Sequence, residues 1–309
     1  MPKLAVIIPC FNEEVAIGRV VADFRAALPR AIVFVYDNNS TDRTAAAAAT
    51  AGAVVREARL RGKGHVIRRM FADVDADIYV LVDGNDTYDA AAAPKMVDLL
   101  TSRGLDMVNG ARASNGGVTH RRGRRMGNAM LTGIVARIFG AHLNDMLSGY
   151  RVFSRRFVKS FPALATGFET GTEFTIHALE LRMPMAEVRT TYRDRPEGSA
   201  SKLRAYTDGF RILRTIAMLV KEERPLQFFG LCAALLLAAS LALGLPVVLE
   251  FARTHLVPRL PTAILATGCV LLAMMALMCG LILDSVTRGR REMKQLAYLA
   301  VPPLPMDDV

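Results

Sequence analysis

The stretch LVDGNDTY, residues 81–88, carries side chains that a protein could use to hold a divalent metal against a phosphate. It follows the apolar run IYVLV and places Asp83 and Asn85 two positions apart, so both side chains project to the same side of an extended chain. A hard ion such as Mg²⁺ accepts amide oxygens as well as carboxylates and takes further ligands from phosphate and water. Because an asparagine stands where a second carboxylate is usual, we expect weak binding of the free ion. Binding of a metal that arrives with a nucleotide should be retained.

Three further segments have polar groups placed for a ligand: IIPCFNEE (residues 7–14), VYDNNSTD (35–42) and RLRGKGH (59–65). Asp37 and Asn38 follow an apolar run and could hydrogen-bond a base or a ribose, although such residues also form ordinary capped turns. Lys63 lies in a glycine-rich basic loop and could reach a phosphate. Glu13 begins a predicted helix, where acidic residues commonly complement the helix dipole.

All of these segments lie where apolar runs end, and the runs alternate with helical stretches. LAVIIP, AIVFVYD, AVVREA and DIYVLVD are separated by helical patterns of about 10–15 residues. The alternation predicts crossover units and an α/β fold, with a mostly parallel sheet flanked by helices. Ligands of such sheets bind at the carboxyl ends of the strands. We therefore expect three of the segments to gather along one edge of the sheet: IIPCFNEE, VYDNNSTD and LVDGNDTY.

The order and spacing of these four segments resemble the family 2 glycosyltransferases, over about residues 3–200. The GT-A fold of that family is Rossmann-like and binds a nucleotide sugar together with a divalent metal, Mg²⁺ or Mn²⁺. The resemblance implies a nucleotide-sugar pocket formed by Pro9, Phe11, Glu13, Asp37, Lys63 and Asp83. It also implies that the place of the family's metal motif is taken by Asp83, Asn85 and Asp86.

Later segments resemble the polyisoprenyl-phosphate glycosyltransferases, the group that contains dolichyl-phosphate mannose and bactoprenol glucosyl synthases. NDMLSGYRVFSRR (residues 144–156) is similar to the Asp-x-x-Ser-Gly-[Phe/Tyr] motif of that group. RPEGSASKL (195–203) is similar to its Arg-x-x-Gly-x-Ser-Lys-Leu segment, with an extra residue after Gly198. DMVNGARASNGGVTHRRGRRMGN, upstream of both, resembles a strand ending in Gly-x-Arg and a basic mobile loop. The resemblance implies a polyprenyl phosphate as the acceptor.

A lipid phosphate is a doubly charged anion, and arginine binds phosphate with a planar, permanently charged fork. The side chains that could hold the acceptor phosphate are Arg112, Arg124, Arg125, Ser148, Arg195 and Lys202. For Arg124 and Arg125 the alternative is a solvated basic loop. Asp145 could orient the acceptor or the sugar. The predicted catalytic set is Asp83, Arg112, Asp145 and Arg195.

The implied reaction needs little acid–base catalysis, because a phosphate oxygen is already deprotonated and nucleophilic. Metal and basic residues would stabilise the departing nucleoside diphosphate while the acceptor attacks the anomeric carbon in line, with inversion. Glu169 and Glu173 lie one helical turn apart. They either face the sugar or form the polar face of a helix.

Two windows, residues 226–249 and 262–283, are nearly free of charge. Each exceeds the roughly 20 residues that a helix needs to cross a hydrocarbon core, so we predict two transmembrane helices rather than a buried hairpin. Basic residues are frequent outside the pair and few in the link between its members, which places both flanks in the cytoplasm, at the inner membrane. The net charge of +10 then forms a basic collar against anionic lipids. No zinc-finger spacing or stacking-aromatic motif favours nucleic acid.

The expected organisation has five parts. These are a cytoplasmic catalytic domain at residues 1–200, an amphipathic juxtamembrane helix at 201–225, transmembrane helices at 226–250 and 262–284, and a cytoplasmic tail at 285–309. A hairpin of two spans is too small to flip the product, so we also expect a separate flippase. The sugar, the base (UDP or GDP) and the oligomeric state, including a homo-oligomer, are left open.

Three alternatives differ in what they require. A processive polysaccharide synthase would carry a Gln-x-x-Arg-Trp motif, and this chain has no tryptophan. A transferase that acts on a lipid hydroxyl would need a base such as Glu173. A catalytically silent membrane scaffold would explain Asn85, and it predicts loss of metal-dependent nucleotide binding.

Overall fold

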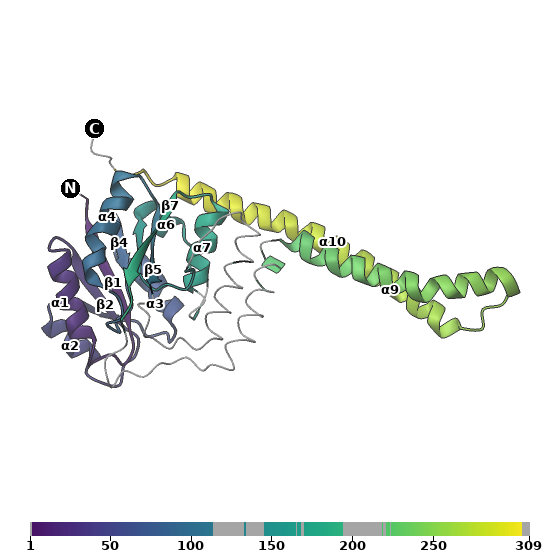
Figure 1. Cartoon of the computed structure of the whole chain (residues 1–309), viewed down its shortest axis with the longest axis horizontal. Helices are drawn as coiled ribbons and strands as arrows, with labels where there is room; N and C mark the ends of the chain where they lie inside the picture. The colour runs from purple at the N-terminus through teal and green to yellow at the C-terminus, as the bar shows by residue number, and fades with distance from the viewer. Residues whose placement is uncertain are drawn as a thin grey trace. The chain divides into compact units, whose positions relative to one another are not determined.

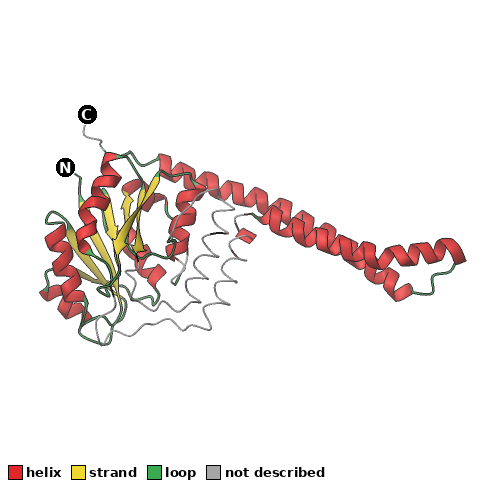
Figure 2. Ribbon diagram, in the orientation of Figure 1, coloured by secondary structure: helices red, strands yellow, loops and turns green. Residues whose placement is uncertain are grey.

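The structure, a computed structural model, describes residues 2–113, 133, 145–164, 166–167, 170–193, 218, 221–222 and 224–304. The chain forms two compact units, residues 1–210 together with 293–309, and residues 211–292. The first unit contains a sheet covered by helices, and the second contains long helices (Figure 2).

The described part of the first unit is built on a seven-stranded sheet with the order β3-β2-β1-β4-β6-β5-β7. The strands are β1 Leu4–Cys10, β2 Ile32–Asp37, β3 Val54–Glu57, β4 Ile78–Leu81, β5 Met107–Ala113, β6 Arg151–Ser154 and β7 Met185–Thr191. Strand β6 runs antiparallel to β4 and β5, and the other pairs are parallel. This confirms the predicted mostly parallel α/β sheet. The chain moves outward from β1 to β3 and then returns to β4 on the other side of β1, so the carboxyl ends of β1 and β4 mark a topological switch point.

Helices cover both faces of this sheet (Figure 1). One face packs against α1 Ile17–Ala27, α2 Thr44–Thr50 and α4 Ala93–Ser102, and the other against α3 Lys63–Asp73, α6 Arg155–Ser160 and α7 Thr170–Glu180. Alternate residues of β1 supply the two faces: Val6 and Ile8 join the first cluster, and Ala5 and Ile7 join the second. The apolar run of β1 is continuous because the strand is buried on both sides.

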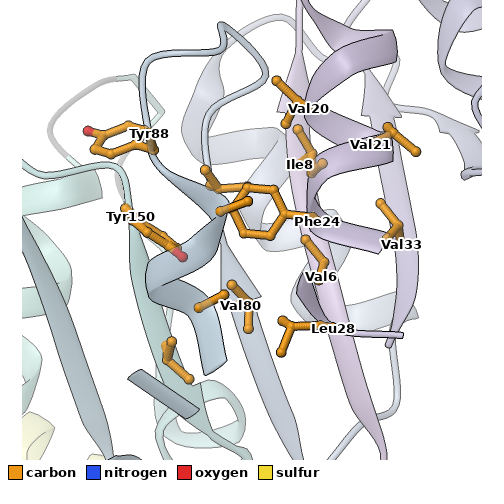
Figure 3. Close-up of a cluster of buried hydrophobic side chains, with 14 of the residues drawn as sticks. Val6, Ile8, Val20, Val21, Phe24, Leu28, Val33, Val80, Tyr88 and Tyr150 are labelled. Carbon is orange, nitrogen blue, oxygen red and sulfur yellow. The ribbon is translucent and has the colours of Figure 1, made fainter. Parts of the chain in front are cut away.

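The core under α1 holds two site segments together. The buried residues of α1 lie at the spacing of one helical face and are Ile17, Val20, Val21 and Phe24. The Phe24 ring lies edge-on to Tyr150 with centroids 5.8 Å apart, and Tyr150 lies 5.5 Å from Tyr88 (Figure 3). Tyr88 belongs to the loop after β4, and Tyr150 directly precedes β6. The same cluster therefore anchors the predicted metal loop and the predicted acceptor motif.

Residues 293–304 rejoin the first unit. Lys294 Nζ lies 2.6 Å from Glu180 Oε2, and the Tyr298 hydroxyl donates to Asp106 Oδ2 at 2.8 Å. The Arg156 guanidinium lies 4.9 Å from the centroid of the Tyr298 ring. This part of the predicted tail thus packs as part of the first unit.

The second unit contains α9 Pro225–Thr254 and most of α10 Leu260–Leu299. Both helices are long and apolar enough to cross a membrane, with mean hydropathies of 2.4 and 2.3 over their most apolar windows. Ser240 Oγ donates to the Ala266 carbonyl at 2.8 Å, and a Cβ added to Gly280 would lie 3.0 Å from Phe229 Cβ. Small residues thus allow the helices to approach closely. Both predicted spans fall within these helices, and α10 continues beyond the predicted end. Almost all of the predicted juxtamembrane segment, 201–225, lies outside the described residues.

Candidate active site

The loops that follow β1 and β2 are joined to each other by hydrogen bonds at one edge of the sheet. The Asn12 N–H donates to Ser40 Oγ at 2.9 Å, and the Thr41 N–H donates to Asn12 Oδ1 at 2.8 Å. The Glu13 N–H donates to Thr44 Oγ1 at 2.8 Å. Asn12 has a φ of 51°, a left-handed conformation that asparagine adopts more readily than most residues. Two of the segments expected to meet are therefore joined directly.

Asp37 has an oxygen placed for a ligand. Pro9 lies in β1, Phe11 and Glu13 follow it, and Asp37 ends the adjacent β2, so these predicted pocket residues share an edge. Asp37 Oδ2 accepts from the Ser40 N–H at 3.1 Å. The other oxygen, Oδ1, is buried and has no hydrogen-bond partner within the described part of the chain. Burying a carboxylate oxygen without a donor is costly, so this atom is suited to accept a hydrogen from a bound molecule.

Asn38 supports the site and does not face a ligand. Its Nδ2 donates to the carbonyls of Ala58 and Leu60 at 2.8 and 2.7 Å, and its Oδ1 accepts from the Gly62 N–H at 2.9 Å. The expectation that Asn38 could contact a base or ribose is wrong here, because its short amide side chain is used by the neighbouring backbone. These bonds fix the loop that leads into Lys63.

Asp83 lies between two other segments of the site. Its Oδ1 is 2.5 Å from Lys63 Nζ at the start of α3. A Cβ added to Gly149 would come within 2.4 Å of Asp83 Oδ2, so only glycine at position 149 allows this approach. A Cβ on Gly84 would similarly lie 2.3 Å from Cys10 Sγ. The two glycines let the loop after β4 pack against β1 and against the predicted acceptor motif.

The remaining predicted metal residues have different partners. Asn85 Oδ1 accepts from Thr87 Oγ1 at 2.6 Å, and Asp86 Oδ2 lies 3.6 Å from Arg19 Nε on α1. Within the described ranges, no group of three or more His, Cys, Asp and Glu side chains is arranged to hold a metal. One carboxylate with a nearby amide oxygen fits a hard divalent ion that takes its other ligands from a diphosphate and water.

Arg112 and Asp145 form a bidentate ion pair. Arg112 Nε and Nη2 donate to the two carboxylate oxygens of Asp145 at 2.7 and 2.9 Å, and the Arg112 guanidinium lies 5.5 Å from the centroid of the Tyr192 ring. Burial alone would lower the pKa of Arg112 and raise the pKa of Asp145. The mutual hydrogen bonds and opposite charges reverse both effects, so the pKa of Arg112 is raised and that of Asp145 is lowered. The structure brings these two predicted residues together and keeps both charged.

Residues 5–161 match the family model described as glycosyl transferase family 2. The chain belongs to this family. Glycosyltransferase AglJ of Haloferax volcanii is 32% identical over 96% of this chain and 98% of the relative. The dolichyl-phosphate hexose transferase of the same organism is 33% identical over 72% of this chain and 95% of its own.

Solved structures share the fold of this family 2 glycosyltransferase. Glucosyl-3-phosphoglycerate synthase of M. tuberculosis has a TM-score of 0.57 at 25% identity, over 71% of this chain and 80% of that chain. The same synthase has been solved with Mn²⁺, UDP and glucosyl-3-phosphoglycerate. The family and the GT-A architecture expected from the sequence are confirmed.

In this glycosyltransferase the segment before β6 is held from inside the fold. Ser148 is 1% exposed, and its hydroxyl donates to the Gly110 carbonyl at 2.5 Å. The structure thus gives this predicted phosphate contact a different role, joining β5 to the segment. Arg151 is fully buried and donates to the Met146 carbonyl at 2.7 Å and to Thr175 Oγ1 at 2.9 Å. The acceptor motif is therefore supported by buried polar groups.

Sequence reasoning missed other residues that hold Asp145. Asn109 Nδ2 donates to the Asp145 carbonyl and to Glu187 Oε1, both at 2.8 Å, and the Asp145 N–H donates to Glu187 Oε1 at 3.2 Å. Asn109 interrupts an apolar strand, and a polar residue there is a detectable signal. Glu187 is 78 residues further along the chain from Asn109 and carries no comparable signal.

Several predicted residues of the glycosyltransferase lie outside the described residues: Arg124, Arg125, Glu169, Arg195 and Lys202. Glu173 is described, and its Oε1 accepts from the Leu164 N–H at 2.8 Å. This contact gives Glu173 a part in holding the loop before α7.

Proposed function

We propose that this glycosyltransferase transfers a hexosyl group from a nucleoside-diphosphate sugar to a polyprenyl phosphate, with metal dependence and inversion at the anomeric carbon. The observation that carries the proposal is the close approach of Asp83 to Gly149. It brings the loop assigned to the donor diphosphate against the segment that resembles the polyprenyl-phosphate motif. Transfer requires the reacting atoms to approach within about 3–3.5 Å, so donor and acceptor groups must meet at such a junction.

The donor side follows from the edge formed by β1, β2 and β4. The unpartnered Asp37 Oδ1 would accept a hydrogen from a ring N–H of the base, which both uracil and guanine have. Lys63 would contact the diphosphate. A divalent metal held by Asp83 and Asn85 would supply positive charge to the departing diphosphate. The mycobacterial synthase solved with Mn²⁺ and UDP supports testing UDP-sugars first.

The acceptor side favours a phosphate over a lipid hydroxyl. A hydroxyl acceptor needs a base, and Asp145 is a poor base because Arg112 holds the pKa of its carboxyl below the ordinary value. A phosphate oxygen needs no base. The guanidinium of Arg112 has five N–H donors, and Asp145 uses only those on Nε and Nη2. The similarity to a dolichyl-phosphate hexose transferase supports the same acceptor class.

The proposed location is the inner membrane, with the catalytic unit and the tail in the cytoplasm. Helices α9 and α10 are long and apolar enough to span. Residues 293–304 belong to the same unit as the N-terminal part of the chain, which requires both flanks to lie on one side of the membrane. The basic flanks favour the cytoplasmic side. Transport of the product would need a separate flippase, and transport by the purified protein alone would contradict this.

The test is transfer of radiolabelled sugar from a panel of UDP- and GDP-sugars to undecaprenyl phosphate, using the full chain in detergent with Mg²⁺, Mn²⁺ or EDTA. We expect metal-dependent product that falls by about a hundredfold or more in Asp83→Ala. Hydrolysis of the donor without transfer would point to another acceptor. Absence of both activity and nucleotide binding would favour the silent scaffold.

A further inference from the structure

Two residues assigned to the donor bind each other in the structure. Lys63 Nζ lies 2.5 Å from Asp83 Oδ1, and the two side chains are 18% and 27% exposed. The lysine that is predicted to bind the phosphate is therefore paired with the carboxylate that is predicted to bind the metal. This pairing determines what a metal must displace before it can bind.

The backbone around Lys63 is fixed. The Gly62 N–H donates to Asn38 Oδ1 at 2.9 Å, and the Gly64 N–H donates to the Thr166 carbonyl at 3.2 Å. Gly62 has a φ of 124°, and a Cβ there would lie 2.3 Å from the Thr166 oxygen. These contacts hold the backbone on both sides of Lys63. The part of Lys63 that can change position is therefore its flexible side chain. It can move between partners without any change in the loop.

Asn85 makes the charge on this loop easy to neutralise. With a second acid at position 85, one ammonium would leave a net negative charge for a free metal ion. With Asn85, the Lys63 ammonium balances the Asp83 carboxylate. Asp86, the next acid, is near Arg19 instead. A free divalent ion would have to displace a tethered cation and would gain only one carboxylate and neutral ligands.

We propose that Lys63 is an internal counter-ion that makes metal binding at Asp83 conditional on the donor diphosphate. This inference rests on the proposed nucleoside-diphosphate donor. The diphosphate supplies anionic oxygens to Lys63 at the same time as it brings ligands for the metal. Lys63 then moves to the phosphate, and Asp83 becomes available to the ion. Metal and nucleotide bind as a coupled pair, and each raises the affinity for the other by the same factor.

The test measures binding, using the full chain in detergent. Bound Mn²⁺ is quantified by electron paramagnetic resonance, without nucleotide and at saturating UDP, for the natural protein, Lys63→Met and Lys63→Arg. We expect Mn²⁺ alone to bind the natural protein weakly and Lys63→Met about five- to tenfold more tightly. The factor by which saturating UDP raises the affinity for Mn²⁺ should therefore be smaller in Lys63→Met than in the natural protein, so the coupling shrinks. Lys63→Arg keeps the cation and should keep the coupling.

Equal affinity of Lys63→Met and the natural protein for Mn²⁺ alone would overturn the inference, provided that thermal unfolding shows the variant to be folded. Tight binding of Mn²⁺ alone to the natural protein would overturn it as well. If the natural protein binds no UDP in the presence of Mn²⁺, the proposed function itself fails. Sugar transfer with unchanged metal affinity in Lys63→Met would retain the function and reject only the role of Lys63.

Discussion

The candidate active site contains two cation–carboxylate pairs that differ in their contacts. Lys63 and Asp83 share one contact, and both side chains are partly exposed, at 18% and 27%. Arg112 and Asp145 share two side-chain hydrogen bonds, and their side chains are 25% and 8% exposed, so the pairs differ in the burial of the carboxylate and in the number of contacts. Asp145 is also held through its backbone by Glu187. The first pair can be opened by a ligand, whereas the second is part of the framework of the site.

The two pairs are therefore suited to different roles. The Lys63–Asp83 pair is suited to ligand binding, and the Arg112–Asp145 pair to structural support. The Lys63–Asp83 pair has a single contact between side chains that are both within reach of solvent, so a ligand can exchange its partners more easily than those of a bidentate pair. Removing one partner of a buried pair costs about 3–5 kcal/mol, because a charge is left without compensation. Under the proposed function, the donor side would rearrange around a diphosphate, and the acceptor side would keep its geometry when substrates bind and leave.

The largest expected effect comes from Asp145→Asn. It should lower the free energy of unfolding of the first unit by about 2–3 kcal/mol, because Arg112 keeps its charge but loses the opposing one. All seven tyrosines lie in the first unit, so tyrosine fluorescence during denaturation measures this. Asp23→Asn, in an exposed pair with Arg19, is the matched control and should change little. Equal small effects of both variants would show that the buried pair is not structural.

The pH dependence of the stability lost in Asp145→Asn gives a sharper comparison of the two ion pairs. The pKa of Asp145 is lowered in the folded protein from an ordinary value of 3.8. At pH values below 3.8 the Asp145 carboxyl binds more protons in the unfolded state than in the folded state. The stabilisation that the ionised carboxylate provides is therefore fully present above this pH and is lost as the pH falls through the folded pKa. The difference in unfolding free energy between the natural protein and Asp145→Asn should be constant from pH 7 to 5 and should narrow below about pH 4. Narrowing already at pH 6 would contradict the assignment.

The variant Lys294→Met tests whether burial of the carboxylate alone determines how much stability is lost when an ion pair is broken. The Lys294–Glu180 pair has one contact, like the donor pair, but its carboxylate is only 2% exposed. We expect a loss of about 1–2 kcal/mol by tyrosine fluorescence. The exposed Lys95 of α4 provides the control Lys95→Met, with an expected change within about 0.5 kcal/mol. If Lys294→Met and Lys95→Met change the free energy of unfolding equally, burial of the carboxylate does not determine the size of the loss.

The smallest effect should be that of Asp86→Asn. Asn tolerates the φ of 54° at this position, and the contact of Asp86 is with Arg19. Affinity for Mn²⁺ in the presence of UDP should change by less than about twofold, whereas Asp83→Asn should lower it by about tenfold or more. A tenfold loss in Asp86→Asn would make Asp86 a metal ligand.

Much of the fold was predictable because β1 and β4 are short apolar runs that end in polar loops. The antiparallel direction of β6 was not predictable, because a strand as short as Arg151–Ser154 carries no directional signal. The pairing of Arg112 with Asp145 depends on strand order in space, which local pattern does not encode. The sequence left two roles open for Asn38, because an amide after a strand bonds a base or nearby backbone equally well. The contacts of Lys294 and Tyr298 with the first unit were not predictable, because both residues lie in the predicted tail, 285–309, whose local pattern does not indicate a partner.

These contacts have a consequence for how the molecule is made. Residues 294–304 form the end of α10 and the segment after it, so they leave the ribosome after α9 and after the most apolar part of α10. Until then Glu180 lacks Lys294, Asp106 lacks the Tyr298 hydroxyl, and Arg156 lacks the Val301 carbonyl. The catalytic unit therefore reaches its full set of contacts only after both helices have been synthesised.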